Sequence, residues 1–159
     1  MILISVGASN FQFDRLFQLM DEICDEKIVD GSKVVAQTGL ISYQIRNYKH
    51  FEFAAYDEMD SLQNKADIII SHAGTGTVIG SLKKRKKVIV FPRLAKYKEH
   101  ESDHQLDLAL SFESKKYILC ATNKEELINS LQSIEDFNPE PFISNTSNFL
   151  RLIECLIEK

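Results

Sequence analysis

The chain has 159 residues, 44% hydrophobic and 26% charged, and its 19 basic and 23 acidic side chains give a net charge of −4. This composition indicates a single globular domain and excludes a disordered or fibrous chain. The acidic balance argues against nucleic acid as a partner, because proteins that coat nucleic acid carry a basic excess. Three cysteines, Cys24, Cys120 and Cys155, lie far apart without CxxC spacing, so we expect reduced thiols rather than disulfides or a zinc site.

The first residues, MILISVG, lack the basic region and the long apolar run of a signal peptide. No stretch of the sequence approaches the roughly 20 apolar residues that a membrane span requires. We therefore expect a cytoplasmic protein, with any membrane role peripheral or supplied by a partner.

Short apolar runs alternate with amphipathic stretches along the chain. Several of the runs are β-branched and nearly continuous, which predicts buried parallel strands at residues 2–6, 33–36, 51–55, 67–71, 88–91 and 117–120. Helical spacing predicts helices over 13–23 and 106–110, and a further helix begins within 77–84. A capping box at Thr122-Asn123-Lys124-Glu125 predicts the next helix, and a last helix carrying Leu150 and Ile153 follows a loop at 137–147.

This alternation predicts an α/β fold, an open parallel sheet with helices on both faces, as one domain over residues 1–159. In such sheets a ligand binds beyond the carboxyl ends of the strands, in the loops that enter the helices. The informative residues of this sequence fall in those loops.

The block His72-Ala73-Gly74-Thr75-Gly76-Thr77 follows a predicted strand and opens a predicted helix. Glycines let a ligand approach the backbone, and a helix N-terminus attracts phosphate through free N–H groups and its dipole. The block has neither the Lys-Ser/Thr ending of a Walker loop nor the spacing of the dinucleotide fingerprint. A tight turn with sterically required glycines, and a structural role for His72, are the alternatives.

A second glycine loop, Gly7-Ala8-Ser9-Asn10, follows the first predicted strand. Two such loops in one sheet are placed to flank one ligand, and the diphosphate of a nucleotide sugar is the natural candidate. The alternative is that Ser9 or Asn10 only caps the following helix. A third loop, Gln37-Thr38-Gly39, follows the second predicted strand and is a weaker candidate for the same crevice.

The segment from Pro92 to Gln105 is a polar loop rich in hydrogen-bonding groups. A metal site is disfavoured, because the two histidines have no third ligand at a suitable spacing. Recognition of sugar hydroxyls fits the mixture better, and a solvated loop with Asp103 as N-cap is the alternative. The candidate residues are Arg93, His100, Asp103, His104 and Gln105.

Five consecutive basic residues, Lys83 to Lys87, stand out in this acidic chain. A helix C-terminus favours such charges through its dipole and explains them without any function. Attraction to an anionic membrane or an acidic partner is the functional alternative.

Three ordered blocks carry a resemblance to a known family: VG-x-S-x-x-x-FD-x-L at the start, ADIIISHAGTGT, and PR…EH…DHQLDLA. From Ile2 to about Ala121 the chain resembles the C-terminal, donor-binding domain of glycosyltransferase family 28. It is most similar to small bacterial capsule and exopolysaccharide glycosyltransferase subunits. These in turn resemble the catalytic subunit of the eukaryotic two-part UDP-N-acetylglucosamine transferase.

The resemblance implies a Rossmann-like half of a GT-B glycosyltransferase that binds a UDP-sugar and needs no metal or cofactor. A separate, membrane-anchored subunit would bind the lipid-linked saccharide acceptor, so the chain would lie at the inner face of the membrane. The implied reaction is inverting transfer of a hexose-type sugar in polysaccharide synthesis. A non-catalytic nucleotide-sugar-binding or regulatory module is the main alternative, and a sugar-nucleotide epimerase fits poorly. A homodimer of the isolated chain is left open.

By this resemblance the two glycine loops would hold the diphosphate and ribose, and the residues 53–56 the uracil. Arg93, His100, Asp103, His104 and Gln105 would line the sugar or diphosphate, with Gln105 placed best for a sugar hydroxyl. No catalytic base is assigned, because His72 and His104 are only weak candidates and the base of such enzymes can lie on the partner. The chain departs from the related peptidoglycan enzyme at Gly80, where that enzyme has a ribose-binding glutamate.

Overall fold

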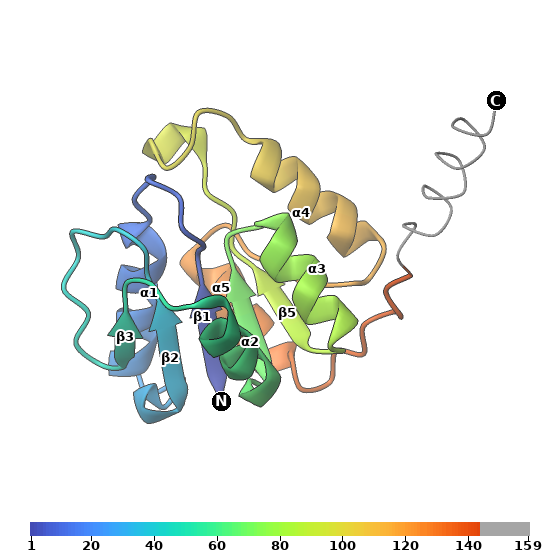
Figure 1. Cartoon of the computed structure of the whole chain (residues 1–159), viewed down its shortest axis with the longest axis horizontal. Helices are drawn as coiled ribbons and strands as arrows, with labels where there is room; N and C mark the ends of the chain where they lie inside the picture. Colours follow the sequence, from blue (N-terminus) through green and yellow to red (C-terminus); the bar gives the residue numbers. More distant parts are fainter. Residues whose placement is uncertain (144–159) are drawn as a thin grey trace.

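The computed structural model describes residues 1–143, which form one open α/β sheet. Within these residues six parallel strands pair in the order β3-β2-β1-β4-β5-β6. Figure 1 shows the sheet with helices in front of it and behind it. The strands are β1 (Ile2–Ser5), β2 (Val34–Gln37), β3 (Lys49–Phe51), β4 (Ile68–Ser71), β5 (Lys87–Val90) and β6 (Leu119–Cys120).

The described residues contain five α-helices, four of which lie between strands while the fifth follows β6. They are α1 (Asp14–Asp25), α2 (Tyr56–Lys65), α3 (Thr75–Lys83), α4 (His104–Ser114) and α5 (Lys124–Ser133). Short 3-10 turns lie at Gly31–Lys33 and Ala95–Tyr97. None of the helices within residues 1–143 combines the length and the apolar character that crossing a bilayer requires.

The two faces of the sheet bury different helices because side chains alternate along a strand. In β1, Ile2 and Ile4 pack in one core cluster with apolar residues of α1 and α5. Leu3 points to the other face and packs beside α2. Helices α3 and α4 pack with Val88 and Val90 of β5 on that same face. The expected parallel sheet with helices on both faces is confirmed.

One strand prediction is wrong in its position. Residues 51–55 were expected to form a strand because they are largely apolar, but β3 ends at Phe51. β3 is an edge strand that pairs only with β2, and beyond Phe51 the chain turns toward α2. Phe53, half exposed, therefore lies outside the sheet. Helix α2 itself was not predicted, because none of its residues is fully buried and its apolar stripe is weak.

Two local predictions are also corrected. The cap of α5 is Asn123, one residue later than expected, because its side chain accepts from Glu126 N while Glu126 accepts in return from Thr122 N. Neither Ser9 nor Asn10 caps α1, which begins after Phe13 without a side-chain cap. The last predicted helix, with Cys155 and the second part of the 137–147 loop, lies outside the described residues; Cys24 and Cys120 are free and partly buried.

Candidate functional site

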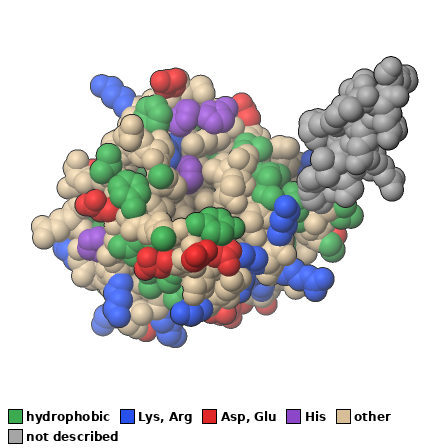
Figure 2. Space-filling model, in the orientation of Figure 1, with side chains coloured by type: hydrophobic (Ala, Val, Ile, Leu, Met, Phe, Trp, Pro, Cys, Tyr) green, Lys and Arg blue, Asp and Glu red, His purple; other side chains and the backbone are tan. Residues whose placement is uncertain are grey.

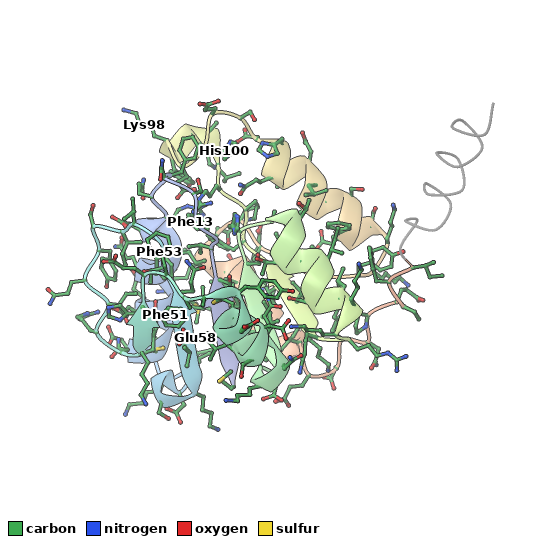
Figure 3. All side chains as sticks on the ribbon, in the orientation of Figure 1. Phe13, Phe51, Phe53, Glu58, Lys98 and His100 are labelled. Carbon is green, nitrogen blue, oxygen red and sulfur yellow. The ribbon has the colours of Figure 1, made fainter. Side chains whose placement is uncertain are left out.

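A cavity of about 810 Å³ lies between α2 and α3, beside the carboxyl ends of β1 and β2. Figure 3 shows Phe53 on the segment that leads from β3 into α2, at this side of the molecule. The cavity combines exposed aromatic side chains with backbone of the two glycine loops, which suits a ligand with both apolar and anionic parts. Its walls include Gly7, Ala8, Phe53, Tyr56, Asp60, Gln63, Thr75, Gly76, Thr77, Gly80 and Lys84.

The glycine block supplies the anion-binding end of this cavity. Helix α3 begins at Thr75, so the free backbone N–H groups of its first turn lie beside the cavity. A Cβ atom added at Gly76 would have nothing within 4 Å. The backbone at Gly76 is therefore open to the cavity.

Gly7 and Gly74 have a different reason to be glycine. A Cβ atom at Gly74 would lie 2.5 Å from Cε1 of His72, and one at Gly7 would lie 3.0 Å from the same atom. The imidazole thus fills the space between the two glycine loops and sets their separation. At these two positions glycine is therefore required for steric reasons, because a larger residue would collide with the His72 ring.

His72 is a buried, neutral histidine. Only 8% of it is exposed, and its Nδ1 lies 3.4 Å from the carbonyl oxygen of Ser5. Burial, with a further contribution from the positive charge of Arg93, lowers the pKa of His72 to about 4. A group with so low a pKa is a poor general base near pH 7. The next residue, Ala73, has a φ of +71° and turns the chain toward α3.

Gln37, the last residue of β2, joins the first glycine loop to the segment after β3 through hydrogen bonds. Its Oε1 accepts from Gly7 N at 3.0 Å and its Nε2 donates to Gly7 O and Glu52 O, both at 2.9 Å. The third loop thus serves the crevice mainly by holding Gly7 in place. Ser9 and Asn10 lie farther along, and Ser9 Oγ accepts from Phe11 N.

Arg93 places a buried positive charge behind the crevice. Its side chain is 1% exposed, and its Nη2 donates to the carbonyl oxygens of Val6 and Phe11 at 3.3 and 3.2 Å. The guanidinium lies 5.0 Å from the centre of the Phe13 ring. Within residues 1–143 its Nε and Nη1 have no acceptor. Burial lowers the pKa of Arg93 to about 10, so the group stays charged near neutral pH and favours an anion nearby.

Gln105 and Asp103 hold the β5–α4 loop together. Gln105 is buried, and its Oε1 accepts from Arg93 N at 3.1 Å. Its amide oxygen is thus already used inside the domain, and Gln105 does not line the α2–α3 cavity. Asp103 precedes α4 as expected, but its carboxylate accepts from Ala95 N at 2.7 Å and closes the loop rather than capping the helix.

His100 and His104 form a cluster with Phe11, in which His104 is exposed and the other two side chains are partly buried. The two imidazole centres lie 4.5 Å apart, and Phe11 lies 5.0 Å from His100. Figure 2 shows histidine side chains gathered at this end of the molecule, and Figure 3 labels His100 on the β5–α4 loop. No three His, Cys, Asp or Glu side chains in residues 1–143 come together as a metal site. The cluster does not line the α2–α3 cavity.

A nearly buried ion pair that the sequence did not suggest supports this loop. Arg15 of α1 donates from Nε and Nη2 to the two carboxylate oxygens of Glu99, both at 2.8 Å. Arg15 also donates to the carbonyl oxygens of Pro92 and Thr122. The pair therefore fastens the β5–α4 loop to α1. No local pattern could reveal it, because the partners are 84 residues apart.

The basic run is largely engaged in contacts within the domain. Lys84 pairs with Asp60, and the Nζ atoms of Lys86 and Lys87 donate to carbonyl oxygens of other segments. The run ends α3 as the dipole argument expects. Lys83 and Arg85 are its exposed members.

Comparison with known proteins identifies a protein family that matches this chain. A family model for the glycosyltransferase family 28 C-terminal domain matches residues 1–154. The chain is 26% identical over 127 residues to the UDP-N-acetylglucosamine transferase subunit ALG13 of Debaryomyces hansenii, covering 76% of this chain and 59% of that protein. It is also 41% identical over 83 residues to the UDP-N-acetylglucosamine–N-acetylmuramyl-(pentapeptide) pyrophosphoryl-undecaprenol N-acetylglucosamine transferase of Clostridium botulinum. That match covers 52% of this chain and 22% of the relative, so the chain spans less than two thirds of either protein.

Solved structures show the same fold. An NMR solution structure of ALG13 superposes with a TM-score of 0.63 at 23% identity, covering 96% of this chain and 94% of that one. The glycotransferase of kitacinnamycin gives a TM-score of 0.60 at 12% identity, over 84% of this chain and 34% of the other. The sheet and its helices are thus like those of the C-terminal domains of GT-B glycosyltransferases.

Proposed function

The chain belongs to the family of glycosyltransferase family 28 C-terminal domains, and from this membership we propose that it is the donor-binding subunit of a two-part, UDP-sugar-dependent glycosyltransferase. The observation that carries the proposal is the cavity between α2 and α3, with the open backbone of Gly76 at the N-terminus of α3. This arrangement suits a nucleoside diphosphate, because it offers N–H groups to phosphate and aromatic side chains to a base.

The proposed reaction is an inverting transfer. An acceptor hydroxyl attacks the anomeric carbon of the bound sugar, the bond from that carbon to the diphosphate breaks, and UDP leaves. The N-terminus of α3 and the buried charge of Arg93 favour the negative charge that develops on the leaving group. On this basis we expect the reaction to need no metal or other cofactor, and chelation by EDTA should leave transfer unchanged.

The general base stays unassigned on this chain. His72 has too low a pKa to accept a proton efficiently near pH 7. His104 is exposed, and its Nδ1 lies 3.0 Å from Ser102 Oγ. A base on the partner subunit fits both observations.

For the sugar we propose a hexose-type donor, to be tested first with UDP-N-acetylglucosamine because both relatives above carry that name. UDP-galactose and UDP-glucuronic acid are the competing donors. For the acceptor we propose a lipid-linked saccharide in the synthesis of a capsule or exopolysaccharide. The Clostridium relative, named for a pyrophosphoryl-undecaprenol acceptor, supports the lipid-linked part of this proposal.

We further propose that the acceptor site lies on a separate, membrane-anchored subunit. The chain would then be cytoplasmic and held at the inner face of the membrane by that partner. The word subunit in the name of the Debaryomyces relative supports this assignment. Whether the chain forms a homodimer when it is isolated from the partner is a separate question, which sedimentation analysis would answer.

The test begins with calorimetric titration of the purified chain with UDP, GDP and ADP. We expect selective binding of UDP, and its loss in Gly76→Val, a variant whose added side chain meets only the open cavity. Equal affinity for the three nucleotides, or no binding, would contradict the proposal. Transfer of labelled sugar from the donors to the lipid fraction of membranes from the source cells then separates an enzyme subunit from a non-catalytic binding module.

A further inference from the structure

The middle of the α2–α3 groove contains a fixed amide that the sequence analysis did not consider. Gln63 of α2 lies opposite Gly80 of α3, and its Oε1 would be 3.8 Å from a Cβ atom at that glycine. Both residues line the cavity. Because Gly80 has no side chain, nothing from α3 covers the amide at this point, and the amide borders the cavity.

Lys84 holds this amide in one orientation. Its Nζ donates to Gln63 Oε1 at 3.2 Å and to the main-chain oxygen of Asp60 at 3.2 Å, and it pairs with the Asp60 carboxylate. The second carboxylate oxygen of Asp60 accepts from Asn64 at 2.9 Å. Within residues 1–143 the Gln63 NH₂ group makes no hydrogen bond. Lys84 therefore holds the amide through its oxygen, and the two N–H donors of Gln63 are available to a ligand.

The position along α3 indicates which part of a ligand this amide meets. Gly80 follows Gly76 by four residues, which corresponds to about 6 Å along a helix. A nucleotide with its phosphates at the first turn of α3 therefore has its next group, the pentose, near Gly80. The vicinal hydroxyls of a ribose are partners for an amide, which donates from nitrogen and accepts on oxygen.

We propose that Gln63, oriented by Lys84, binds the ribose hydroxyls of the nucleotide and makes the site selective for ribonucleotides. This inference rests on the proposed function, because it assumes that the cavity holds a nucleoside diphosphate. Removing the hydroxyls leaves the amide without its partner. One lost hydrogen bond of ordinary strength corresponds to about threefold to tenfold weaker binding.

The experiment compares two ligands, UDP and 2′,3′-dideoxy-UDP, which keeps the uracil and the diphosphate but lacks both hydroxyls. Each is titrated by calorimetry into the purified chain, into Gln63→Leu, and into the control Gln18→Leu, which makes the same change on an exposed part of α1. Leucine is a good helix former and Gln63 is partly exposed, so we expect all three proteins to fold, as circular dichroism will verify.

The wild-type chain and Gln18→Leu should prefer UDP by about threefold to tenfold, and Gln63→Leu should bind both ligands equally. No preference in the wild-type chain, or an unchanged preference in Gln63→Leu, would overturn the role of Gln63 while leaving the proposed function intact. If the wild-type chain binds neither ligand, the nucleotide site itself fails, and the assignment of Gln63 fails with it.

Discussion

The two glycines of the 72–77 block should respond in opposite ways to the same substitution. Gly76 lies in the first turn of α3 with no atom near its Cβ position, so Gly76→Ala should raise the free energy of unfolding by about 0.5–1 kcal/mol through better helix propensity and a less flexible unfolded chain. Gly74→Ala places a methyl group 2.5 Å from Cε1 of the buried His72. Overpacking of this kind costs about 1–3 kcal/mol.

Urea unfolding followed by circular dichroism measures both changes, and calorimetry with UDP measures binding. For a chain of this size, 1 kcal/mol corresponds to about 2–4 °C in Tm, so the two variants should be well separated in thermal melts as well. Gly76→Ala should nevertheless bind UDP more weakly than the wild-type chain, because the added methyl group covers backbone that faces the cavity. A more stable protein with weaker binding would identify Gly76 as a ligand-facing glycine.

Two results would refute this reasoning. If Gly74→Ala were as stable as the wild-type chain, His72 would not fill the space between the glycine loops. If Gly76→Ala bound UDP with unchanged affinity, the first turn of α3 would not be where the ligand approaches the backbone.

Three further predictions concern the charged groups. Glu99→Gln leaves the Arg15 guanidinium without its counter-charge and should lower the free energy of unfolding by about 3 kcal/mol in urea titrations. If the losses from Glu99→Gln and Arg15→Met were strictly additive in the double variant, the pairing would be contradicted. Between pH 6.5 and about 4 the unfolded chain takes up a proton on His72 that the folded chain excludes, so the free energy of unfolding should fall over this range and be unaffected by His72 above it. The wild-type chain should therefore lose up to about 3 kcal/mol more of its free energy of unfolding than His72→Gln. Equal pH profiles of stability for the two proteins would rule out a buried neutral ring. Lys84→Met should cost about 1 kcal/mol and Lys83→Met almost nothing, and vesicle binding that depends on Lys83 but not on Lys84 would show that the exposed charge of the run meets a membrane.

Much of the sheet was predictable because its signal is local. Runs such as Ile68-Ile69-Ile70 are apolar at every position, as strands covered on both faces must be. The residues after these runs belong to loops at the carboxyl edge whatever the details of packing. This is why five residues of the two predicted glycine loops, Gly7, Ala8, Thr75, Gly76 and Thr77, meet at one cavity.

The errors lie where packing outweighs pattern. The apolar residues 53–55 resemble a strand, but at the edge of the sheet the chain turns away after Phe51 and Phe53 lies beside the cavity. Helix α2 has no buried stripe to reveal it, and the site residue Gln63 was missed with it.

The sequence by itself determined the parallel sheet, four of the five described α-helices, the edge of the sheet where the glycine loops lie, and the family to which the blocks belong. Only the tertiary structure decided what each loop residue does. His72 separates two glycines that are 67 residues apart, and Arg15 meets Glu99 across 84 residues. Local propensity and periodicity act over a few residues, whereas the position of a buried side chain depends on which distant segments the sheet brings together.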